Sequence, residues 1–301
     1  MKKADIKTGF LCNNNCLFCV QGPEKKKFGN KNTKELIEII KKAKRGCDTI
    51  VFTGGEPTIR RDLIELVALA KKLKFKTIQI QSNGRMFVYE NFCKDIVDAG
   101  ANEFALALHG HNAELHNYLT GAESFRQIVS GIKTLKKMKQ KVITNTVVTK
   151  SNYRHLPEIV KVLIGLDVDQ IQFAFVHAVG AAGNNFDSVV PRMEMVAPYL
   201  KEAIDIGKML GKKVMTEGIP FCLLVGYEKS ISEVVMPDIK IFDQISVIDN
   251  YKKMRINSDK AKGPECSNCI YNNICEGPWK EYPREFGWDE FKPVIKKKKD
   301  V

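Results

Sequence analysis

Three cysteines near the amino end of the chain have the spacing of a metal-binding loop. They are Cys12, Cys16 and Cys19, in a C-x₃-C-x₂-C run with no fourth cysteine close by. Cysteine thiolates ligate iron–sulfur clusters, and a [4Fe–4S] cluster has four irons to ligate. Three protein ligands leave one iron open, and an open position distinguishes a reactive metal site from a closed structural one. A zinc loop would instead show paired C-x₂-C runs or histidines at set spacing.

This run resembles the signature of the radical S-adenosylmethionine (radical SAM) family. In that family the amino and carboxylate groups of the SAM methionine chelate the open iron. The residue before the third cysteine is usually aromatic and lies near the adenine, and Phe18 matches it. The resemblance implies a [4Fe–4S] cluster bound with SAM and a flavodoxin or ferredoxin as reductant. It also implies that SAM is cleaved to a 5′-deoxyadenosyl radical, which abstracts hydrogen from a substrate.

A second motif, Gly54-Gly55-Glu56-Pro57, follows an apolar run. Paired glycines let a backbone approach a ligand closely and adopt dihedral angles barred to other residues. Alone, such a turn is typical of an ordinary strand-to-helix connection. Beside the cysteine run it resembles the family motif whose backbone binds the methionine amino group of SAM. We therefore predict that these four residues seat the methionine, with Glu56 placed to accept from an ammonium group.

Polar residues on two further apolar runs are candidates for the same cofactor site. Ser82 and Asn83 end the third run, where related enzymes approach the SAM carboxylate or ribose; a simple strand terminator is the alternative. Asn145 lies within the fifth run, and alternation places every second residue of a strand on the interior face. A buried asparagine needs a hydrogen-bond partner. The family implies ribose hydroxyls, and a partner within the core is the alternative.

Histidines cluster after the fourth apolar run. His109 ends that run, at a position where several family members carry a serine or a charged residue that touches SAM or substrate. His111 and His116 follow closely, and surface-loop histidines are the alternative for all three. The turn 177–180 after the sixth run is a weaker candidate for a position beside the adenine.

A second set of cysteines lies near the carboxyl end, in the run Cys266-x₂-Cys269-x₅-Cys275. Its spacing resembles the SPASM and shorter twitch extensions of radical SAM enzymes, which hold auxiliary iron–sulfur clusters. Cys222 is placed in the sequence to be a fourth ligand. The resemblance implies one auxiliary [4Fe–4S] cluster, closed by four thiolates and suited to electron transfer. A Cys₄ zinc site is the alternative.

The composition favours a reducing compartment. The 301 residues contain nine cysteines, no signal-peptide pattern and no apolar run of the roughly 18 residues that a membrane span needs. We expect a cytoplasmic protein with no membrane contact, in which Cys47 and Cys93 are buried small hydrophobes. The net charge of +13 indicates a solvated lysine-rich surface. An acidic reductant or RNA is the alternative, and nucleic acid is not favoured because aromatic residues do not interleave the charges.

The spacing of apolar residues predicts the elements that position these motifs. Strands are expected at 5–11, 48–53, 76–81, 103–109, 141–149 and 170–176, and helices at 33–45, 61–73, 90–99, 123–139, 153–166 and 197–210. Thr33 is the expected N-cap of the first helix and Gly100 the expected end of the third. Six βα units imply parallel strands, and the family implies a partial (β/α)₆ TIM-like barrel in an α/β fold. Chemistry in such barrels lies at the carboxyl ends of the strands.

The rhythm fails after residue 212. We therefore predict a radical SAM barrel over 1–212 and a small irregular cysteine-rich extension over 213–301, with 214–217 a candidate for one more strand. The implied activity is an oxidative modification of a peptide or protein. Alternatives are conversion of a cofactor or nucleotide precursor, as in molybdenum-cofactor biosynthesis, and RNA modification. A metal-binding scaffold or electron carrier without radical chemistry is the non-enzyme alternative.

Overall fold

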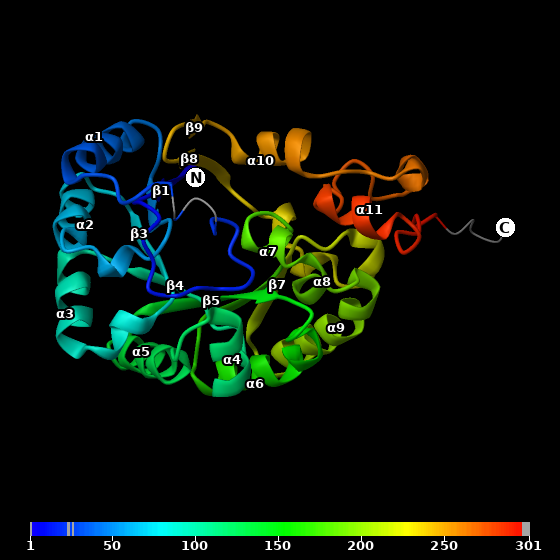
Figure 1. The fold of residues 1–301 in the computed structure, drawn as a ribbon, viewed down its shortest axis with the longest axis horizontal. Helices are drawn as coiled ribbons and strands as arrows, with labels where there is room; N and C mark the ends of the chain where they lie inside the picture. The colour runs from blue at the N-terminus through cyan, green and yellow to red at the C-terminus, as the bar shows by residue number, and fades with distance from the viewer. Residues whose placement is uncertain (1, 23–24, 26, 297–301) are drawn as a thin grey trace.

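The computed structural model describes residues 2–22, 25 and 27–296, and its centre is a nine-stranded sheet curved into an open barrel (Figure 1). The spatial order of the strands is β7-β6-β5-β4-β3-β2-β1-β8-β9. Their bounds are β1 Lys2–Lys7, β2 Thr49–Thr53, β3 Thr77–Ser82, β4 Glu103–Leu106, β5 Lys141–Val148, β6 Gln170–Phe175, β7 Lys213–Glu217, β8 Asp238–Phe242 and β9 Val247–Ile248. Neighbouring strands are parallel except β8 and β9. The predicted partial barrel of consecutive βα units is confirmed.

Most helices cover the outer face of the barrel, whereas α10 and α11 lie to one side of it (Figure 1). The helices are α1 Thr33–Lys44, α2 Leu63–Lys72, α3 Glu90–Ala99, α4 Ala113–Thr120, α5 Phe125–Lys137, α6 Leu156–Gly165, α7 Ala181–Asn184, α8 Phe186–Val189, α9 Met193–Met209, α10 Tyr251–Met254 and α11 Glu281–Phe286. The six predicted helices are all present, and α4, α7, α8, α10 and α11 are additional. Gly100 ends α3 at φ 122°, as predicted. The predicted cap Thr33 is wrong, because Asn32 Oδ1 accepts from the Glu35 N–H at 2.8 Å.

The first strand is shorter than predicted. It ends at Lys7, and residues 8–11 leave the sheet. Gly9 has φ 145° and forms an isolated antiparallel bridge with Asn30 instead of continuing the strand. This early exit brings the cysteine loop over the carboxyl ends of the strands.

The two faces of the sheet differ in burial, as β5 shows. Its even-numbered residues, from Val142 to Val148, are buried, whereas Ile143, Asn145 and Val147 are only partly buried. We call the face that carries Asn145 the lumen. Asn145 lies opposite Gln172 of β6 in the strand register. Asn145 therefore lies on the less buried face of β5, and its place at the cofactor site stays a prediction.

The sheet continues past residue 212. The candidate strand at 214–217 is confirmed as β7, and β8 pairs in parallel with β1 on its far side. The expectation of an irregular extension over 213–301 is wrong at β8, where Ile241 and Phe242 are buried. Helices α10 and α11 lie on the side of the molecule away from α3 (Figure 1). The division of the chain at residue 212 remains a prediction.

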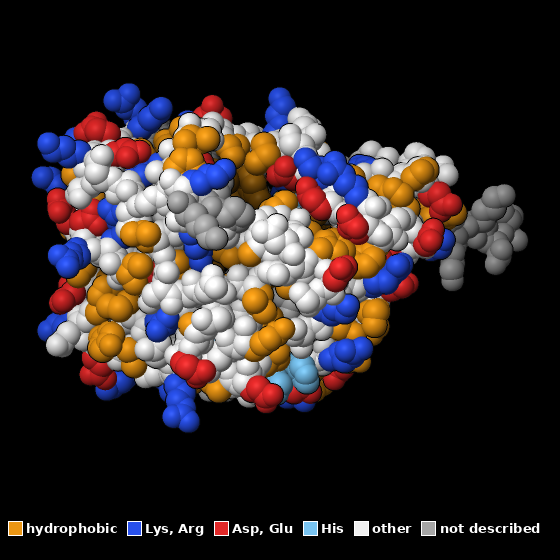
Figure 2. All heavy atoms as spheres, in the orientation of Figure 1, with side chains coloured by type: hydrophobic (Ala, Val, Ile, Leu, Met, Phe, Trp, Pro, Cys, Tyr) orange, Lys and Arg blue, Asp and Glu red, His pale blue; other side chains and the backbone are white. Residues whose placement is uncertain are grey.

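The surface carries charges of both signs. Figure 2 shows Lys and Arg side chains scattered among Asp and Glu on one face rather than gathered in a single patch. Ion pairs account for several of them, such as Lys136 with Asp169 at 2.8 Å. In the part of the chain that the structure describes, no helix is both long and apolar enough to cross a membrane.

Candidate functional site

The three amino-terminal cysteines lie in one loop directly after β1. All three thiols are free and partly buried. Burial, with smaller effects of the neighbouring thiols of Cys19 and Cys12, raises the pKa of Cys16 to about 12, because thiolates repel one another. Burial likewise raises the pKa of Cys12. Three crowded thiols of this kind become thiolates most readily when a metal takes their charge.

The paired glycines make room for this loop. The Gly55 N–H donates to Gly9 O at 2.7 Å, and the Glu56 N–H donates to Leu11 O at 2.8 Å. A Cβ on Gly55 would lie 2.2 Å from Leu11 O, and one on Gly54, whose φ is 120°, would lie 2.3 Å from Gly9 O. Both positions therefore require glycine, because the entry to the cysteine loop runs against them. Two N–H groups of the motif are therefore bonded to the cysteine loop. That the motif also binds the methionine of SAM stays a prediction.

Glu56 joins the ends of two strands. Its Oε1 accepts from Thr58 Oγ1 at 2.5 Å and from Ser82 Oγ at 2.8 Å, and its Oε2 accepts from the Asn83 N–H at 2.7 Å. The carboxyl group is buried, and burial raises its pKa in spite of these donors. The structure thus brings Glu56, Ser82 and Asn83 together beside Pro57, as the sequence predicts.

The end of β3 also contacts the cysteine loop. Asn83 Nδ2 donates to Asn13 Oδ1 at 2.7 Å. Arg85 Nη1 donates to Asn13 O at 2.5 Å and to Asn14 Oδ1 at 3.0 Å. Arg85 was not predicted as a site residue, and its only signal in the sequence is a basic residue two positions after Asn83. Its contacts hold the segment between the first two cysteines.

The other side of the loop packs on α4 and α7. The Asn15 N–H donates to Thr120 O at 2.9 Å, and the Ala181 N–H donates to Cys19 O at 2.8 Å. Gly180 has φ 62°, and a Cβ there would lie 2.2 Å from Val20 O. The end of the turn 177–180 therefore packs against the backbone that follows Cys19, a contact that was not predicted from the sequence. A place beside the adenine stays a prediction.

Phe18 and His109 form an aromatic pair at the end of β4. Their ring centroids are 4.6 Å apart in an edge-to-face arrangement. His109 Nδ1 accepts from the Val147 N–H at 3.1 Å, which leaves the proton on Nε2. Burial lowers the pKa of His109 well below its usual value, with a smaller effect of His116. His109 is therefore a neutral hydrogen-bond donor next to Phe18.

The other two histidines have different surroundings. His116 is fully buried, its Nδ1 accepts from the backbone N–H of His109 at 3.1 Å, and burial lowers its pKa to about 4. His116 thus holds the backbone of His109 in place. His111 lies apart and packs on His155, with ring centroids 4.8 Å apart.

Asn145 presents an unused acceptor to the lumen. Its Oδ1 is buried and has no hydrogen-bond partner among the described residues. A buried acceptor of this kind calls for a donor from water or a ligand. The hydroxyl groups of a ribose are donors that fit it.

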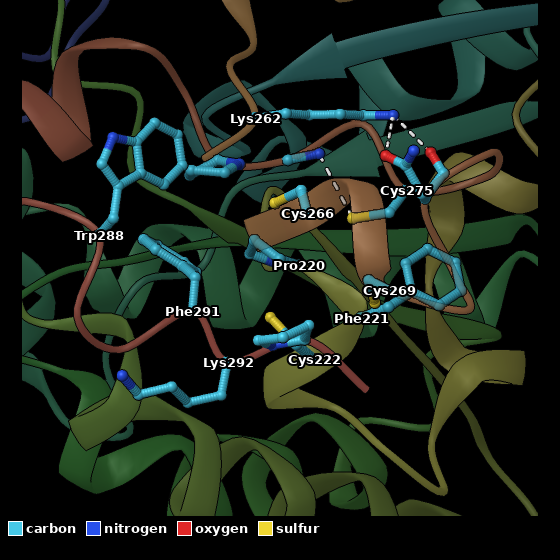
Figure 3. Close-up of a pocket in the computed structure, with 14 residues that line it drawn as sticks. Pro220, Phe221, Cys222, Lys262, Cys266, Cys269, Cys275, Trp288, Phe291 and Lys292 are labelled. Atoms are coloured by element: carbon cyan, nitrogen blue, oxygen red, sulfur yellow. Dashed lines mark hydrogen bonds between the residues drawn. The ribbon is translucent and has the colours of Figure 1, made fainter. Parts of the chain in front are cut away.

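The carboxyl-terminal cysteines converge on a single cavity of about 420 Å³, part of it open to solvent (Figure 3). Cys222 lies in a 3₁₀ turn, Phe221–Leu223, after β7, whereas Cys266, Cys269 and Cys275 come from the later loop. Burial, with smaller effects of the other three thiols, raises the pKa of Cys222 to about 12. The predicted grouping of Cys222 with the later cysteines is therefore present in the fold.

The surroundings of this cavity suit a cluster. The Gly277 N–H donates to Cys275 Sγ and the Val294 N–H to Cys269 Sγ, both at 3.4 Å. Apolar walls come from Phe221, Trp288 and Phe291 (Figure 3). Among the described residues, no three Cys, His, Asp or Glu side chains are close enough to hold one metal ion. The irons of a cluster each take a separate thiolate, so a cluster does not need that arrangement.

The two remaining cysteines belong to the core. Cys93 is fully buried on α3, with its Sγ 3.1 Å from Phe87 O, and Cys47 is 5% exposed. Both pack within the main hydrophobic core. Their prediction as buried small hydrophobes is confirmed.

Comparisons with known proteins agree with this geometry. The sequence model described as the radical SAM superfamily matches residues 6–163. A probable GTP 3′,8-cyclase of Sulfurisphaera tokodaii is 27% identical over 197 residues, which cover 65% of this chain and 62% of that protein. The match thus spans less than two thirds of that relative.

Two solved structures share the fold over nearly the whole chain. SuiB of Streptococcus suis bound to S-adenosylmethionine has a TM-score of 0.67 at 18% identity, covering 99% of this chain and 76% of SuiB. Native anSMEcpe with bound AdoMet has a TM-score of 0.68 at 18% identity, covering 98% and 93%. SuiB is also known bound to its precursor peptide SuiA. At this identity the likeness shows the fold alone.

Proposed function

The chain belongs to the radical SAM superfamily, and on this premise we propose that Cys12, Cys16 and Cys19 hold a [4Fe–4S] cluster whose open iron binds SAM. When bound, the cluster and SAM supply a 5′-deoxyadenosyl radical that takes hydrogen from a substrate, and a second cluster supplies an electron acceptor. The observation that carries the proposal is the anchoring of the three-cysteine loop at the carboxyl ends of β2 and β3 and on α4 and α7. That edge is where barrel enzymes place their chemistry.

The residues around the loop supply complementary groups for SAM. Glu56 Oε2 accepts one hydrogen bond and, as a carboxylate oxygen, has capacity for another from the methionine ammonium. Asn145 Oδ1 is a buried acceptor for the ribose hydroxyls. Phe18 offers an apolar edge to the adenine, and His109 offers a neutral Nε2–H donor beside it. These residues bind and orient; the radical chemistry belongs to the cofactors.

We propose that the extension is SPASM/twitch-like and that Cys222, Cys266, Cys269 and Cys275 hold the second [4Fe–4S] cluster. The convergence of Cys222 and the other three cysteines on one cavity supports this ligand set. Four thiolates leave no open iron, so such a cluster exchanges electrons and does not bind substrate. The Gly277 and Val294 N–H donors to sulfur stabilise the thiolate form.

A closed second cluster favours an oxidative reaction, and we propose a peptide or protein as substrate. Loss of a hydrogen atom, then of an electron and a proton, oxidises the substrate by two electrons. The second candidate is a nucleotide precursor, which the GTP 3′,8-cyclase relative favours. Incubation of reconstituted enzyme with SAM, dithionite and GTP separates them. Conversion of GTP supports the second candidate and contradicts the first.

Two cysteine substitutions, one in the loop and one in the core, test the radical chemistry itself. Anaerobically reconstituted Cys16→Ala should form no 5′-deoxyadenosine from SAM and dithionite, because the cluster loses a ligand. Cys47→Ala is the matched control, since Cys47 lies in the core, and it should form 5′-deoxyadenosine like the unchanged protein. Reduced flavodoxin or ferredoxin should replace dithionite. Formation of 5′-deoxyadenosine by Cys16→Ala would refute the ligand assignment.

A further inference from the structure

Arg255 is the largest fully buried side chain among the described residues, and it begins a π-helical turn, Arg255–Asp259. Two nitrogens of its guanidinium face one carboxylate, one through a hydrogen bond and the other through an ion-pair contact alone. Nη2 donates to Glu276 Oε1 at 2.8 Å, and Nε lies 2.8 Å from Glu276 Oε2. A third nitrogen, Nη1, donates to Glu217 Oε1 at 3.1 Å. The side chain therefore connects three segments that are far apart in the sequence.

The two carboxylates have distinct positions. Glu276 follows Cys275, one of the four thiols around the carboxyl-terminal cavity. Glu217 is the last residue of β7, and its Oε2 accepts from Gln172 Nε2 at 2.8 Å. Gln172 lies on the lumen face opposite Asn145. A continuous row of polar contacts thus runs from the lumen through Arg255 to the residue beside Cys275.

The contacts of Arg255 with two carboxylates fix geometry more than they add stability. A buried ion pair gains little over apolar packing, because both charges lose their water. A planar guanidinium that donates to Glu276 through Nη2 and to Glu217 through Nη1 restricts the distance and the rotation between them together, whereas an ammonium group is a single point of charge. Lys260 lies nearby, with Nζ 3.8 Å from the Trp279 ring and 4.0 Å from Glu233 Oε1. It does not contact Glu276, so Arg255 alone makes this connection among the described cations.

We propose that Arg255 is a positioning residue that fixes the Cys275 segment against the carboxyl end of β7. Through it, the second metal site is oriented toward the lumen, where the substrate would lose its electron. This orientation rests on the proposed second cluster, whereas the restraint on residues 264–279 does not. The two parts can therefore be tested separately.

Hydrogen exchange of the iron-free protein tests the restraint. In Arg255→Lys the positive charge is kept but the planar set of hydrogen-bond donors is lost. The amides of residues 264–279 should therefore exchange at least tenfold faster than in the unchanged protein, while the amides of β1–β6 keep their protection. Arg154→Lys, at an exposed position, is the control and should change neither region. Equal exchange of 264–279 in Arg255→Lys would overturn the proposal. Equal acceleration in β1–β6 would also overturn it, because Arg255 would then support the whole fold.

The iron content of the reconstituted proteins tests whether Arg255 is needed to hold the second metal site in place. The unchanged protein should hold about eight irons per chain, and Arg255→Lys about four, with dithionite-driven cleavage of SAM within twofold of the unchanged protein. Eight irons with an unchanged EPR spectrum in Arg255→Lys would overturn the role of Arg255. About four irons in the unchanged protein would instead overturn the proposed second cluster. Glu276→Gln, which weakens the same contact from the other side, should reproduce the effect of Arg255→Lys on exchange.

Discussion

Replacement of Gly55 by alanine is the sharpest test of how the cysteine loop is held. The added Cβ would lie 2.2 Å from Leu11 O and 2.6 Å from Phe10 C. Ordinary contact begins near 3.4 Å, so the two backbones must separate by about 1 Å. That movement breaks the hydrogen bonds from the Gly55 and Glu56 N–H groups, which are 2.7 and 2.8 Å long.

The cost follows from these contacts. Two backbone hydrogen bonds contribute about 1 kcal/mol each, and overpacking costs about 1–3 kcal/mol. Together they predict a loss of about 3–5 kcal/mol and a melting temperature lower by about 5–10 °C. The displaced loop should also hold little iron after anaerobic reconstitution.

Calorimetry of the iron-free protein and iron analysis of the reconstituted protein measure both effects. Gly165→Ala is the control, because nothing lies within 4 Å of a Cβ at that last residue of α6. It should be stabilised by up to about 1 kcal/mol. If Gly55→Ala melts with the unchanged protein and loads the same iron, the glycines do not support the loop as described.

Three further substitutions test single residues. Burial raises the pKa of Asp5 to about 6, so the folded state prefers the proton and loses stability as the pH rises from about 4 to about 6. Asp5→Asn should therefore be up to about 3 kcal/mol more stable at pH 7 and equal below pH 4, and equal melting at both pH values contradicts this. Asn145→Leu removes a buried acceptor that lacks a partner, so the iron-free protein should melt no lower while SAM binds about tenfold more weakly by calorimetry. Cys222→Ala should leave one iron of the second cluster open to cyanide, while saturating SAM occupies the open iron of the first cluster. Cyanide should then change the EPR spectrum of the variant and not that of the unchanged protein. A variant that does not respond to cyanide excludes Cys222 as the fourth ligand.

The barrel and the two cysteine sets were predictable because they depend on local patterns. Apolar residues at the periods of strands and helices located six strands and six helices, and the spacing of Cys12, Cys16 and Cys19 is itself the metal signal. The Gly54–Gly55 pair predicts a close-approach turn, and the structure shows that the Gly55 and Glu56 N–H groups donate to the protein's own loop.

What the sequence did not reveal depends on contacts between distant segments. Arg85 meets Asn13 across 72 positions, and Arg255 meets Glu217 across 38. A single arginine in a chain with 48 lysines and arginines carries no periodic signal. Strand β8 was missed because its five residues, between Pro237 and Asp243, are not followed by a long helix as in a βα unit, and they gain their place by pairing with β1. Such pairs are set by tertiary packing rather than by local propensity.

The central claim is that the amino-terminal cluster has an iron that SAM can occupy. A variant with Cys266, Cys269 and Cys275 changed to alanine isolates that cluster, and EPR of the dithionite-reduced protein with and without SAM examines it directly. The proposal predicts about four irons per chain, a shift of the EPR signal on addition of SAM, and formation of 5′-deoxyadenosine. Protein without iron, or a signal that SAM leaves unchanged, would contradict it.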